Sequence, residues 1–394
     1  MLVQPVKSLE ARHCPSGFNT GFQGEQLSFA DYVTQSRNML FSARAKGHSV
    51  QLEKIVEGNA PFELKPAEVA SGCKKSYRRG ILLTHGLTDS PYFMRHLAAF
   101  FQQSGFRVMA ILLPGHGTQP GDLLDTRWQE WAKAVAYGVD RLDEEVEELY
   151  LAGFSAGGTL SVYQSLHDQR VRGLFLFSPA LKVSPRAAFA NAHKLYSWLM
   201  PAGKWLYIRP DHDIYKYESF PKNAAAQMYA LTRKLGSQLQ LHEMDLPVFA
   251  AASEDDATAN TTGTLEFMSR TRHPSSRLVI YSARPDAFSF DIPAEKLELV
   301  NCAMPVQKIL SSAHTAIILP AEDTYYGAGG AYSNCTHYYP GDMEKYNACA
   351  AYPEQILLGE ITPQNLDAGL LCRLMFNPHF AALKISMQRF IDNL

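Results

Sequence analysis

Short apolar runs alternate with amphipathic segments along the chain, most regularly between residues 79 and 181. The runs at residues 81–83, 106–111, 149–152 and 174–177 predict buried strands. Between them, large apolar side chains recur every three or four positions, which predicts helices. This strand–helix alternation indicates the α/β class, with βαβ units around a mostly parallel central sheet that is flanked by helices.

A different pattern fills residues 182–245, where aromatic side chains are dense and the alternation stops. After Pro221, apolar residues at helical spacing predict a helix with the inward positions Met228, Leu231, Leu235 and Leu239. We expect this stretch to form a helical cap, or lid, inserted at one end of the sheet. The sheet is then expected to resume in further strands, at residues 247–250, 278–281 and 306–310.

These patterns divide the chain into four parts. Residues 1–75 are expected to form an N-terminal extension packed on the core, and residues 76–181 form the first half of an α/β core. The cap at 182–245 precedes the second half at 246–394, which carries a loop insertion near 320–355. Two helix starts are also predicted, from a capping box at Ser28 and Asp31 and from Asn377-Pro378 near the C-terminus.

Composition and charge restrict the classes of partner. Hydrophobic residues make up 46% of the chain and charged residues 19%, as in folded globular proteins. The 37 basic and 39 acidic residues give a formal net charge of −2, so nothing electrostatic favours a nucleic-acid partner. No stretch is long and apolar enough to span a bilayer, and the first residues lack the apolar run of a signal peptide.

Cysteine usage bears on the cellular compartment. The six cysteines show no zinc-ligand spacing, but Cys335 and Cys349 bracket a loop that is rich in Gly, Tyr and Asn. A disulfide between them would pin that loop and would indicate an oxidising environment. We therefore expect a cytoplasmic protein by default and a secreted one if this disulfide forms.

The central chemical motif is Gly153-Phe154-Ser155-Ala156-Gly157, which lies between a predicted strand and a predicted helix. A serine hydroxyl is a poor nucleophile unless it is exposed on a sharp turn and paired with a base. Glycines two residues to either side relieve the crowding of such a turn. The backbone N–H of Ala156 would then point toward a developing oxyanion, which makes Ser155 the predicted nucleophile.

A second motif, His85-Gly86-Leu87, closes the first strong strand. In an α/β-hydrolase the loop after this strand supplies the second oxyanion donor, here the N–H of Leu87. Backbone donors suit this task because they are fixed in place before the charge develops. His85 could serve as a base or could brace the loop, and we favour the bracing role.

Three segments carry a family resemblance, and they occur in the order Leu83-Thr84-His85-Gly86, Leu113-Pro114-Gly115-His116-Gly117 and Gly153-Phe154-Ser155-Ala156-Gly157-Gly158. Together they resemble the monoacylglycerol lipase and lysophospholipase branch of the α/β-hydrolases, which is similar to the S33 serine aminopeptidases. The resemblance covers residues 79–180 well, is patchier from 245 to 320, and is absent from the first seventy residues and after Pro320. It implies that His116 is a structural loop residue.

The resemblance also implies where the acid and the base of a catalytic triad lie. The family pattern is a glycine with an aspartate three residues later, which matches Ser253 and Asp256 except for the serine, so that Asp255 stays an alternative acid. His314 follows the predicted strand at 306–310 and a small residue, as the catalytic histidine of the family does. Chain order agrees, because serine, acid and histidine follow one another in this fold.

The expected activity is hydrolysis of a carboxylic ester through an acyl-enzyme, with Ser155 as nucleophile, His314 as general base and Asp256 orienting the histidine. This chemistry needs no metal or organic cofactor. The resemblance implies a small-molecule substrate with a single acyl chain, a lysophospholipid or a monoacylglycerol, and leaves open a transient contact with a membrane surface. The alternatives are a short-chain carboxylesterase, an acyltransferase or a peptidase using the same triad, or a catalytically silent binding protein.

Overall fold

The computed structural model describes residues 8–45, 51–67, 74–183, 201–351 and 353–394. The chain divides into two compact units. We call residues 7–175 and 183–242 the Ser155 unit, and residues 176–182 and 243–394, together with 1–6, the His314 unit. Within the described residues, no helix is long and apolar enough to cross a membrane.

The Ser155 unit is built around five strands in the order β1-β3-β2-β4-β5. Strand β2 pairs in parallel with both β3 and β4, whereas the short β1 runs antiparallel to β3. The strands are almost entirely apolar where they are buried on both faces, which is typical of parallel sheets. Their bounds are β1 Phe62–Leu64, β2 Tyr77–Thr84, β3 Phe106–Ile111, β4 Val146–Phe154 and β5 Val171–Phe177, whose last two residues belong to the His314 unit.

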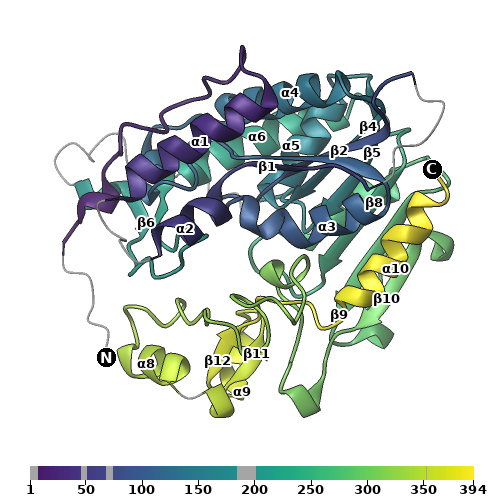
Figure 1. Ribbon diagram of the computed structural model, residues 1–394. Coiled ribbons are helices and arrows are strands. Elements are labelled where there is room, and N and C mark those ends of the chain that lie inside the picture. Colours follow the sequence, from purple (N-terminus) through teal and green to yellow (C-terminus); the bar gives the residue numbers. More distant parts are fainter. Residues whose placement is uncertain (1–7, 46–50, 68–73, 184–200, 352) are drawn as a thin grey trace. The chain divides into compact units, whose positions relative to one another are not determined.

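Helices cover both faces of these strands (Figure 1). Helices α4 (Trp128–Asp143) and α5 (Ala156–Ser165) lie on one face, and α3 (Arg95–Gln103) lies on the other. Trp131 is fully buried on the inner face of α4, and Phe101 of α3 packs edge-on against Phe106 of β3. The predicted parallel sheet flanked by helices is therefore confirmed.

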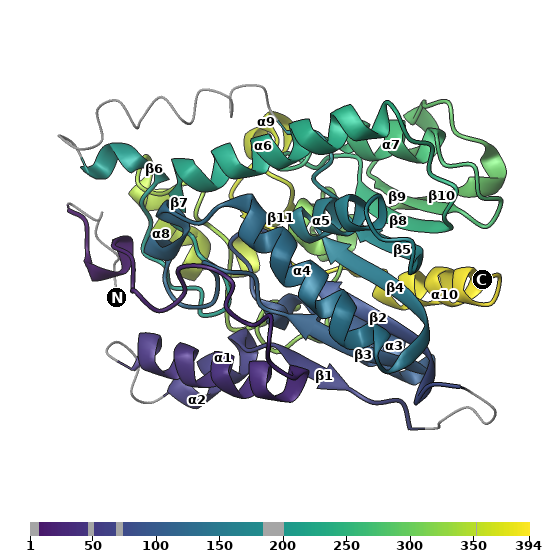
Figure 2. The same ribbon diagram turned by 90° about the horizontal axis from the view of Figure 1, so that it is seen from above.

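The N-terminal extension becomes part of the Ser155 unit. It contributes β1 to the sheet and two neighbouring helices, α1 (Phe29–Arg44) and α2 (Leu52–Asn59), which lie side by side in Figures 1 and 2. The side chain of Ser28 accepts a hydrogen bond from the backbone N–H of Asp31, so the predicted capping residue starts α1. Tyr32 of α1 anchors the helix through hydrogen bonds with the backbone of Leu112.

The predicted cap is described only in part, because residues 184–200, including Phe189, Tyr196 and Trp198, lie outside the described residues. From residue 201 the chain forms the small antiparallel pair β6 (Trp205–Tyr207) and β7 (Phe220–Pro221). The long helix α6 (Lys222–Leu239) follows directly after Pro221, as predicted. Its buried face includes Met228, Leu231 and Leu235.

The His314 unit holds three parallel strands in the order β8-β9-β10. Helix α10 lies along them, and its Phe390 packs on Phe249 of β8 with ring centroids 5.7 Å apart. A second, two-stranded sheet joins β11 and β12. The bounds are β8 Val248–Ser253, α7 Thr261–Ser269, β9 Arg277–Ser282, β10 Leu297–Asn301, α8 Met343–Ala351, β11 Leu357–Gly359, α9 Pro363–Ala368, β12 Leu371–Arg373 and α10 Phe380–Ile391.

Two predictions for this unit were wrong. Residues 306–310 do not form a strand: Pro305–Gln307 is a single 3-10 turn, and Lys308 adopts a left-handed conformation (φ 58°) that interrupts any extended run. The insertion near 320–355 is not entirely loop, since it contains helix α8. The disulfide that the sequence left open is present and links Cys335 to Cys349, tying α8 to the preceding loop.

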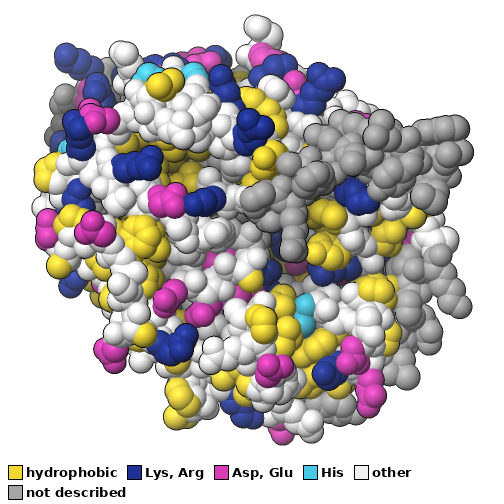
Figure 3. Space-filling model, turned by 180° about the vertical axis from the view of Figure 1, so that it is seen from behind, with side chains coloured by type: hydrophobic (Ala, Val, Ile, Leu, Met, Phe, Trp, Pro, Cys, Tyr) yellow, Lys and Arg dark blue, Asp and Glu magenta, His cyan; other side chains and the backbone are white. Residues whose placement is uncertain are grey.

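Basic and acidic side chains are interspersed on the face shown in Figure 3, in keeping with the near-zero net charge.

Candidate active site

Ser155 occupies a sharp turn between β4 and α5. Its backbone has φ 54° and ψ −115°, outside the regions that a serine prefers. The surrounding structure must hold this strain, which is typical of residues at functional sites. The predicted strand–turn–helix geometry around Gly153-Phe154-Ser155-Ala156-Gly157 is therefore present, and Ala156 is the first residue of α5.

The glycines of the motif are required by close backbone contacts. A Cβ at Gly157 would lie 2.0 Å from the carbonyl oxygen of Thr84, and one at Gly153 would lie 2.2 Å from the carbonyl oxygen of Gly157. A Cβ at Gly86 would lie 3.2 Å from the Cβ of Ser155. The loop after β2 therefore passes directly beside the serine, as an oxyanion loop must.

Leu87, the second predicted oxyanion donor, lies in a tight turn from Gly86 to Asp89. The N–H of Asp89 donates to the carbonyl oxygen of Gly86 at 3.3 Å. Thr88 at the third position of this turn has φ 69°, a left-handed conformation that β-branched residues rarely adopt. The turn holds Leu87 next to Ser155 at the cost of backbone strain in Thr88.

His85 and His116 are structural, as the sequence predicted. Nε2 of His85 accepts the N–H of Leu113 at 3.1 Å, so Nδ1 carries the proton and donates to the carbonyl oxygen of Gly86 at 2.8 Å. The ring of His116 packs edge-on against that of His85, with centroids 5.0 Å apart. Burial lowers the pKa of His116 to about 4 and holds the pKa of His85 well below its ordinary value, so both rings are neutral at pH 7.

In the His314 unit, the structure brings His314 to Asp256. Nδ1 of His314 and Oδ2 of Asp256 are 2.6 Å apart, and both side chains are almost fully buried. The other carboxylate oxygen, Oδ1, accepts the backbone N–H groups of Thr258 and Ala259, each at 2.8 Å. The turn after β8 thus fixes the carboxylate, and the carboxylate fixes the proton of His314 on Nδ1.

Asp255, the alternative acid, makes no comparable contact in the described part of the chain. Its Oδ2 is buried without a hydrogen-bond partner. Burial and the neighbouring carboxylate of Glu254 raise the pKa of Asp255 to about 6. Geometry therefore selects Asp256 over Asp255 as the partner of His314.

A further contact to the histidine, which no sequence pattern indicated, comes from Glu360. This carboxylate is fully buried, and its Oε2 accepts the backbone N–H of His314 at 2.9 Å. Arg373 donates to the same oxygen through Nη2 at 2.8 Å. Although burial opposes ionisation, the Arg373 guanidinium holds the pKa of Glu360 below its usual value. The pair braces the backbone at His314, and Ser178 Oγ adds a hydrogen bond to the carbonyl oxygen of His314 at 3.4 Å.

Ser155, Leu87 and Ala156 thus lie in one unit, and Asp256 and His314 in the other. Their assembly into one triad is part of the function proposed below.

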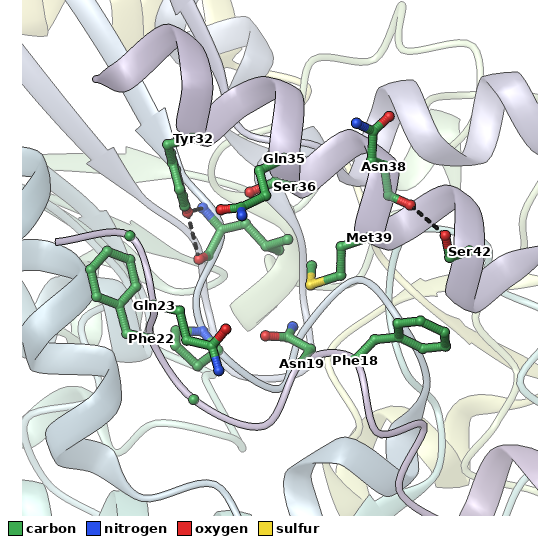
Figure 4. Close-up of a pocket in the computed structure, with 14 residues that line it drawn as sticks. Phe18, Asn19, Phe22, Gln23, Tyr32, Gln35, Ser36, Asn38, Met39 and Ser42 are labelled. Atoms are coloured by element: carbon green, nitrogen blue, oxygen red, sulfur yellow. Dashed lines mark hydrogen bonds between the residues drawn. The ribbon is translucent and has the colours of Figure 1, made fainter. Parts of the chain in front are cut away.

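A separate cavity of ≈ 350 Å³ in the Ser155 unit includes none of these residues (Figure 4). It lies between α1 and the loop at residues 18–24, and Leu112 and Pro114 also line it. Uncharged side chains line it throughout, among them Asn19, Gln35 and Asn38.

A single group of residues within the described ranges could gather three metal ligands, namely Cys335, Cys349 and Cys372. Two of these sulfurs are joined in the disulfide, which leaves one thiol and no metal site of the thiolate type.

Comparison with known proteins places the chain in a family. The family described as Serine aminopeptidase, S33 (Hydrolase_4) matches residues 75–284, just over half of the chain. A thermostable monoacylglycerol lipase from Bacillus sp. (strain H-257) is 28% identical over 193 residues, which are 48% of this chain and 76% of that protein. A carboxylesterase from Bacillus subtilis (strain 168) is 32% identical over 85 residues, 21% of this chain, and the match spans 35% of that protein.

Among solved structures, a monoacylglycerol lipase from Paleococcus ferrophilus has a TM-score of 0.43 at 19% identity, covering 56% of this chain and 88% of the other. The family match includes the strained serine turn and the oxyanion loop, and it begins where the N-terminal extension ends. The chain belongs to the S33 serine aminopeptidase family of α/β-hydrolases, and it is a hydrolase of the lipase and esterase type.

Proposed function

We propose that this hydrolase cleaves carboxylic esters of single-acyl-chain lipids, lysophospholipids or monoacylglycerols, through an acyl-enzyme on Ser155. His314 is the general base and Asp256 its orienting acid. The N–H groups of Leu87 and Ala156 form the oxyanion hole. The observation that carries the proposal is the Asp256–His314 contact of 2.6 Å, because it leaves Nε2 of the imidazole unprotonated and able to accept the serine proton.

The reaction has two halves. In the first, Ser155 Oγ attacks the ester carbonyl while Nε2 of His314 takes its proton, and the C–O bond breaks as the imidazolium protonates the leaving alcohol. In the second, a water molecule gives a proton to Nε2 as it attacks the acyl carbonyl; the bond from the acyl carbon to Ser155 Oγ then breaks, the imidazolium returns the proton to Oγ, and the fatty acid is released. Ala156 contributes the first N–H of α5, where the helix dipole favours the oxyanion charge.

The lipid class rests on the family and on the relatives. A relative that matches 48% of this chain is named a monoacylglycerol lipase, and the match covers 76% of its own length. An acyl chain would gain about 0.8 kcal/mol for each methylene buried in an apolar pocket, which favours long chains over short ones. The carboxylesterase relative supports the alternative of a shorter substrate.

The disulfide between Cys335 and Cys349 supports an oxidising compartment for the protein, since such bonds persist where thiols are not kept reduced.

The test is fatty-acid release from lysophosphatidylcholine and from a monoacylglycerol, compared with hydrolysis of 4-nitrophenyl butyrate and of a peptide amide. Ser155→Ala should abolish release and labelling by a fluorophosphonate probe. Ser165→Ala is the matched control, because Ser165 lies at the far end of the same helix, where its hydroxyl donates to the carbonyl oxygen of Val162. Release from both lipids that is lost in Ser155→Ala and kept in Ser165→Ala supports the proposal.

Other outcomes would assign a different activity. Turnover of the butyrate ester alone would assign a short-chain carboxylesterase, and turnover of the peptide alone would assign a peptidase. Absence of both turnover and labelling in the unmodified protein would refute the catalytic proposal as a whole.

A further inference from the structure

The oxyanion turn is held by a segment far along the chain. Residues 213–219, which belong to the predicted cap, lie against the turn from Gly86 to Asp89 within the Ser155 unit. The N–H of Tyr217 donates to the carbonyl oxygen of Thr88 at 2.9 Å. Lys216 donates through Nζ to Thr88 Oγ1 at 3.1 Å and forms an ion pair with Asp89 Oδ1. Three contacts from two consecutive residues thus fix the last two positions of the turn.

This clamp acts where the turn is strained. Thr88 has φ 69°, and such a conformation in a β-branched residue persists only where neighbouring groups enforce it. The two hydrogen bonds from the cap segment fall on Thr88 itself, one on its carbonyl and one on its hydroxyl. The N–H of Leu87 lies in the peptide plane between Gly86 and Leu87, which is the first plane of this four-residue turn, so its direction depends on the turn keeping its shape.

The ion pair between Lys216 and Asp89 is largely buried, so its loss would disturb the turn. The side chain of Asp89 is 1% exposed, and that of Lys216 is 19% exposed, with Nζ 5.8 Å from the centroid of the Phe93 ring. A buried carboxylate without its cation would move toward water and carry the turn with it. The second oxygen of Asp89, Oδ2, is buried without a hydrogen-bond partner among the residues that the structure describes, and it lies 2.3 Å from where a Cβ on Gly86 would stand. Asp89 therefore touches both ends of the turn.

The cap segment is itself anchored on both sides of Lys216. Tyr215 stacks on Tyr92, with ring centroids 3.9 Å apart, and the ring of Tyr217 lies parallel to that of His116 at 6.4 Å. The side chain of Asn59 donates to the carbonyl oxygen of residue 214 at 2.8 Å. Lys216 is therefore held in place before any substrate arrives.

We propose that Lys216 is a positioning residue for the oxyanion hole: its contacts with Thr88 and Asp89 hold the turn that aims the N–H of Leu87 at the tetrahedral oxyanion. The inference rests on the proposed ester hydrolysis and adds to it a role for the cap. Lys216 acts through Thr88 and Asp89, so its effect belongs to the transition state and leaves binding of the ground-state substrate unchanged.

The test compares Lys216→Met, which keeps the stem on Phe93 and removes the ammonium, with Lys222→Met. Lys222 is the matched control because it lies in the same cap, and its Nζ donates to the carbonyl oxygen of Gly203 rather than to the turn. We expect Lys216→Met to lower kcat for a 4-nitrophenyl ester by about 10- to 100-fold with KM within twofold, since a misplacement near 1 Å can cost about 100-fold. Lys222→Met should keep kcat within twofold.

Two further measurements separate positioning from a merely structural role. A trifluoromethyl ketone forms an oxyanion on the serine, so its affinity should fall in parallel with kcat/KM in Lys216→Met, whereas the affinity of the free fatty-acid product should not change. Asp89→Asn should resemble Lys216→Met, and the double variant should lose little more than either single one. If the methionine variant does not fold, Lys216→Gln removes the ion pair with Asp89 and keeps a hydrogen-bond donor; its kcat and its ketone affinity should fall in parallel, by less than in Lys216→Met.

The outcomes are distinct. If the unmodified protein hydrolyses no ester, the proposed function fails. If it is active and Lys216→Met keeps kcat within twofold, or loses product affinity and ketone affinity equally, the positioning role is overturned while the proposed function stands.

Discussion

Asp256→Asn tests the proposed triad at the contact between Asp256 and His314. In the native turn, Oδ1 of Asp256 accepts the N–H groups of Thr258 and Ala259, and Oδ2 faces Nδ1 of His314 at 2.6 Å. An asparagine can keep both backbone bonds only with its oxygen at the Oδ1 position. Its NH₂ group then faces Nδ1, which must become an acceptor, and the imidazole proton moves to Nε2. The base that should receive the serine proton is then already protonated.

The expected loss is large and confined to catalysis. The wrong tautomer should lower kcat by about four orders of magnitude, or about 5 kcal/mol of transition-state stabilisation. Stability should change far less, by about 1 kcal/mol, because the two hydrogen bonds of the turn persist with a neutral acceptor. The measurements are kcat and KM for a 4-nitrophenyl ester, the rate of fluorophosphonate labelling, and a thermal melt of each variant.

Asp255→Asn is the control. Its carboxylate has a buried oxygen without a partner and a pKa raised to about 6, so the substitution should leave activity within about threefold and should not destabilise the fold. The reasoning would be refuted if Asp256→Asn kept more than about a tenth of the native kcat. If Asp255→Asn lost activity instead, the acid would have to be reassigned to Asp255.

Three further predictions concern stability. Burial holds the pKa of His116 at about 4, whereas the same histidine in the unfolded chain has the ordinary pKa of 6.5, so the unfolded state binds the proton first as the pH falls. The free energy of unfolding should therefore drop by roughly 3 kcal/mol between pH 7 and pH 4. The urea midpoint of His116→Phe should vary less with pH than that of the unmodified protein, and parallel curves for the two proteins would contradict this. Replacing both Cys335 and Cys349 by serine opens a link of sequence separation 14 and should cost about 3 kcal/mol, measured by thermal melting with and without reductant; equal melting in all samples would contradict this. Gly157→Ala would put a Cβ 2.0 Å from the carbonyl oxygen of Thr84 and should abolish activity and lower the melting temperature by several degrees, whereas an active, equally stable variant would show that the turn can relax.

Sequence patterns predicted the structure correctly where a position accepts only one kind of residue. The apolar runs predicted β2 to β5, and the glycines around Ser155 predicted its turn, because close backbone approach admits no other residue there. The strand expected at 306–310 failed for a local reason: Pro305 starts a tight turn and Lys308 is left-handed. Helix α8 was missed since only two of its nine residues, Tyr346 and Cys349, are buried, which leaves almost no apolar periodicity to detect.

The family pattern favoured Asp256 as the acid but left Asp255 open, because two adjacent aspartates have the same chemistry. The turn decided it, by placing two backbone N–H groups on Asp256. The serine at position 253, where the family has glycine, is also explained: Ser253 ends β8 in an extended conformation, and its hydroxyl accepts the N–H of Asp255 at 3.2 Å. Glu360 lies 46 residues beyond His314 with no motif around it, so only the fold could reveal their contact.

The N-terminal extension has a consequence for the order of folding. Arg12 donates to the carboxylate of Asp211 at 3.1 Å and to the carbonyl oxygen of Arg209, and the first of these contacts closes a separation of 199 residues. A ribosome adding about 5–20 residues per second needs roughly 10–40 s to make the intervening chain. The segment around Arg12 therefore waits for Arg209 and Asp211 until the sheet strands between them have been made. Its docking on these two residues can only be a late event, one that closes the Ser155 unit after its core has formed.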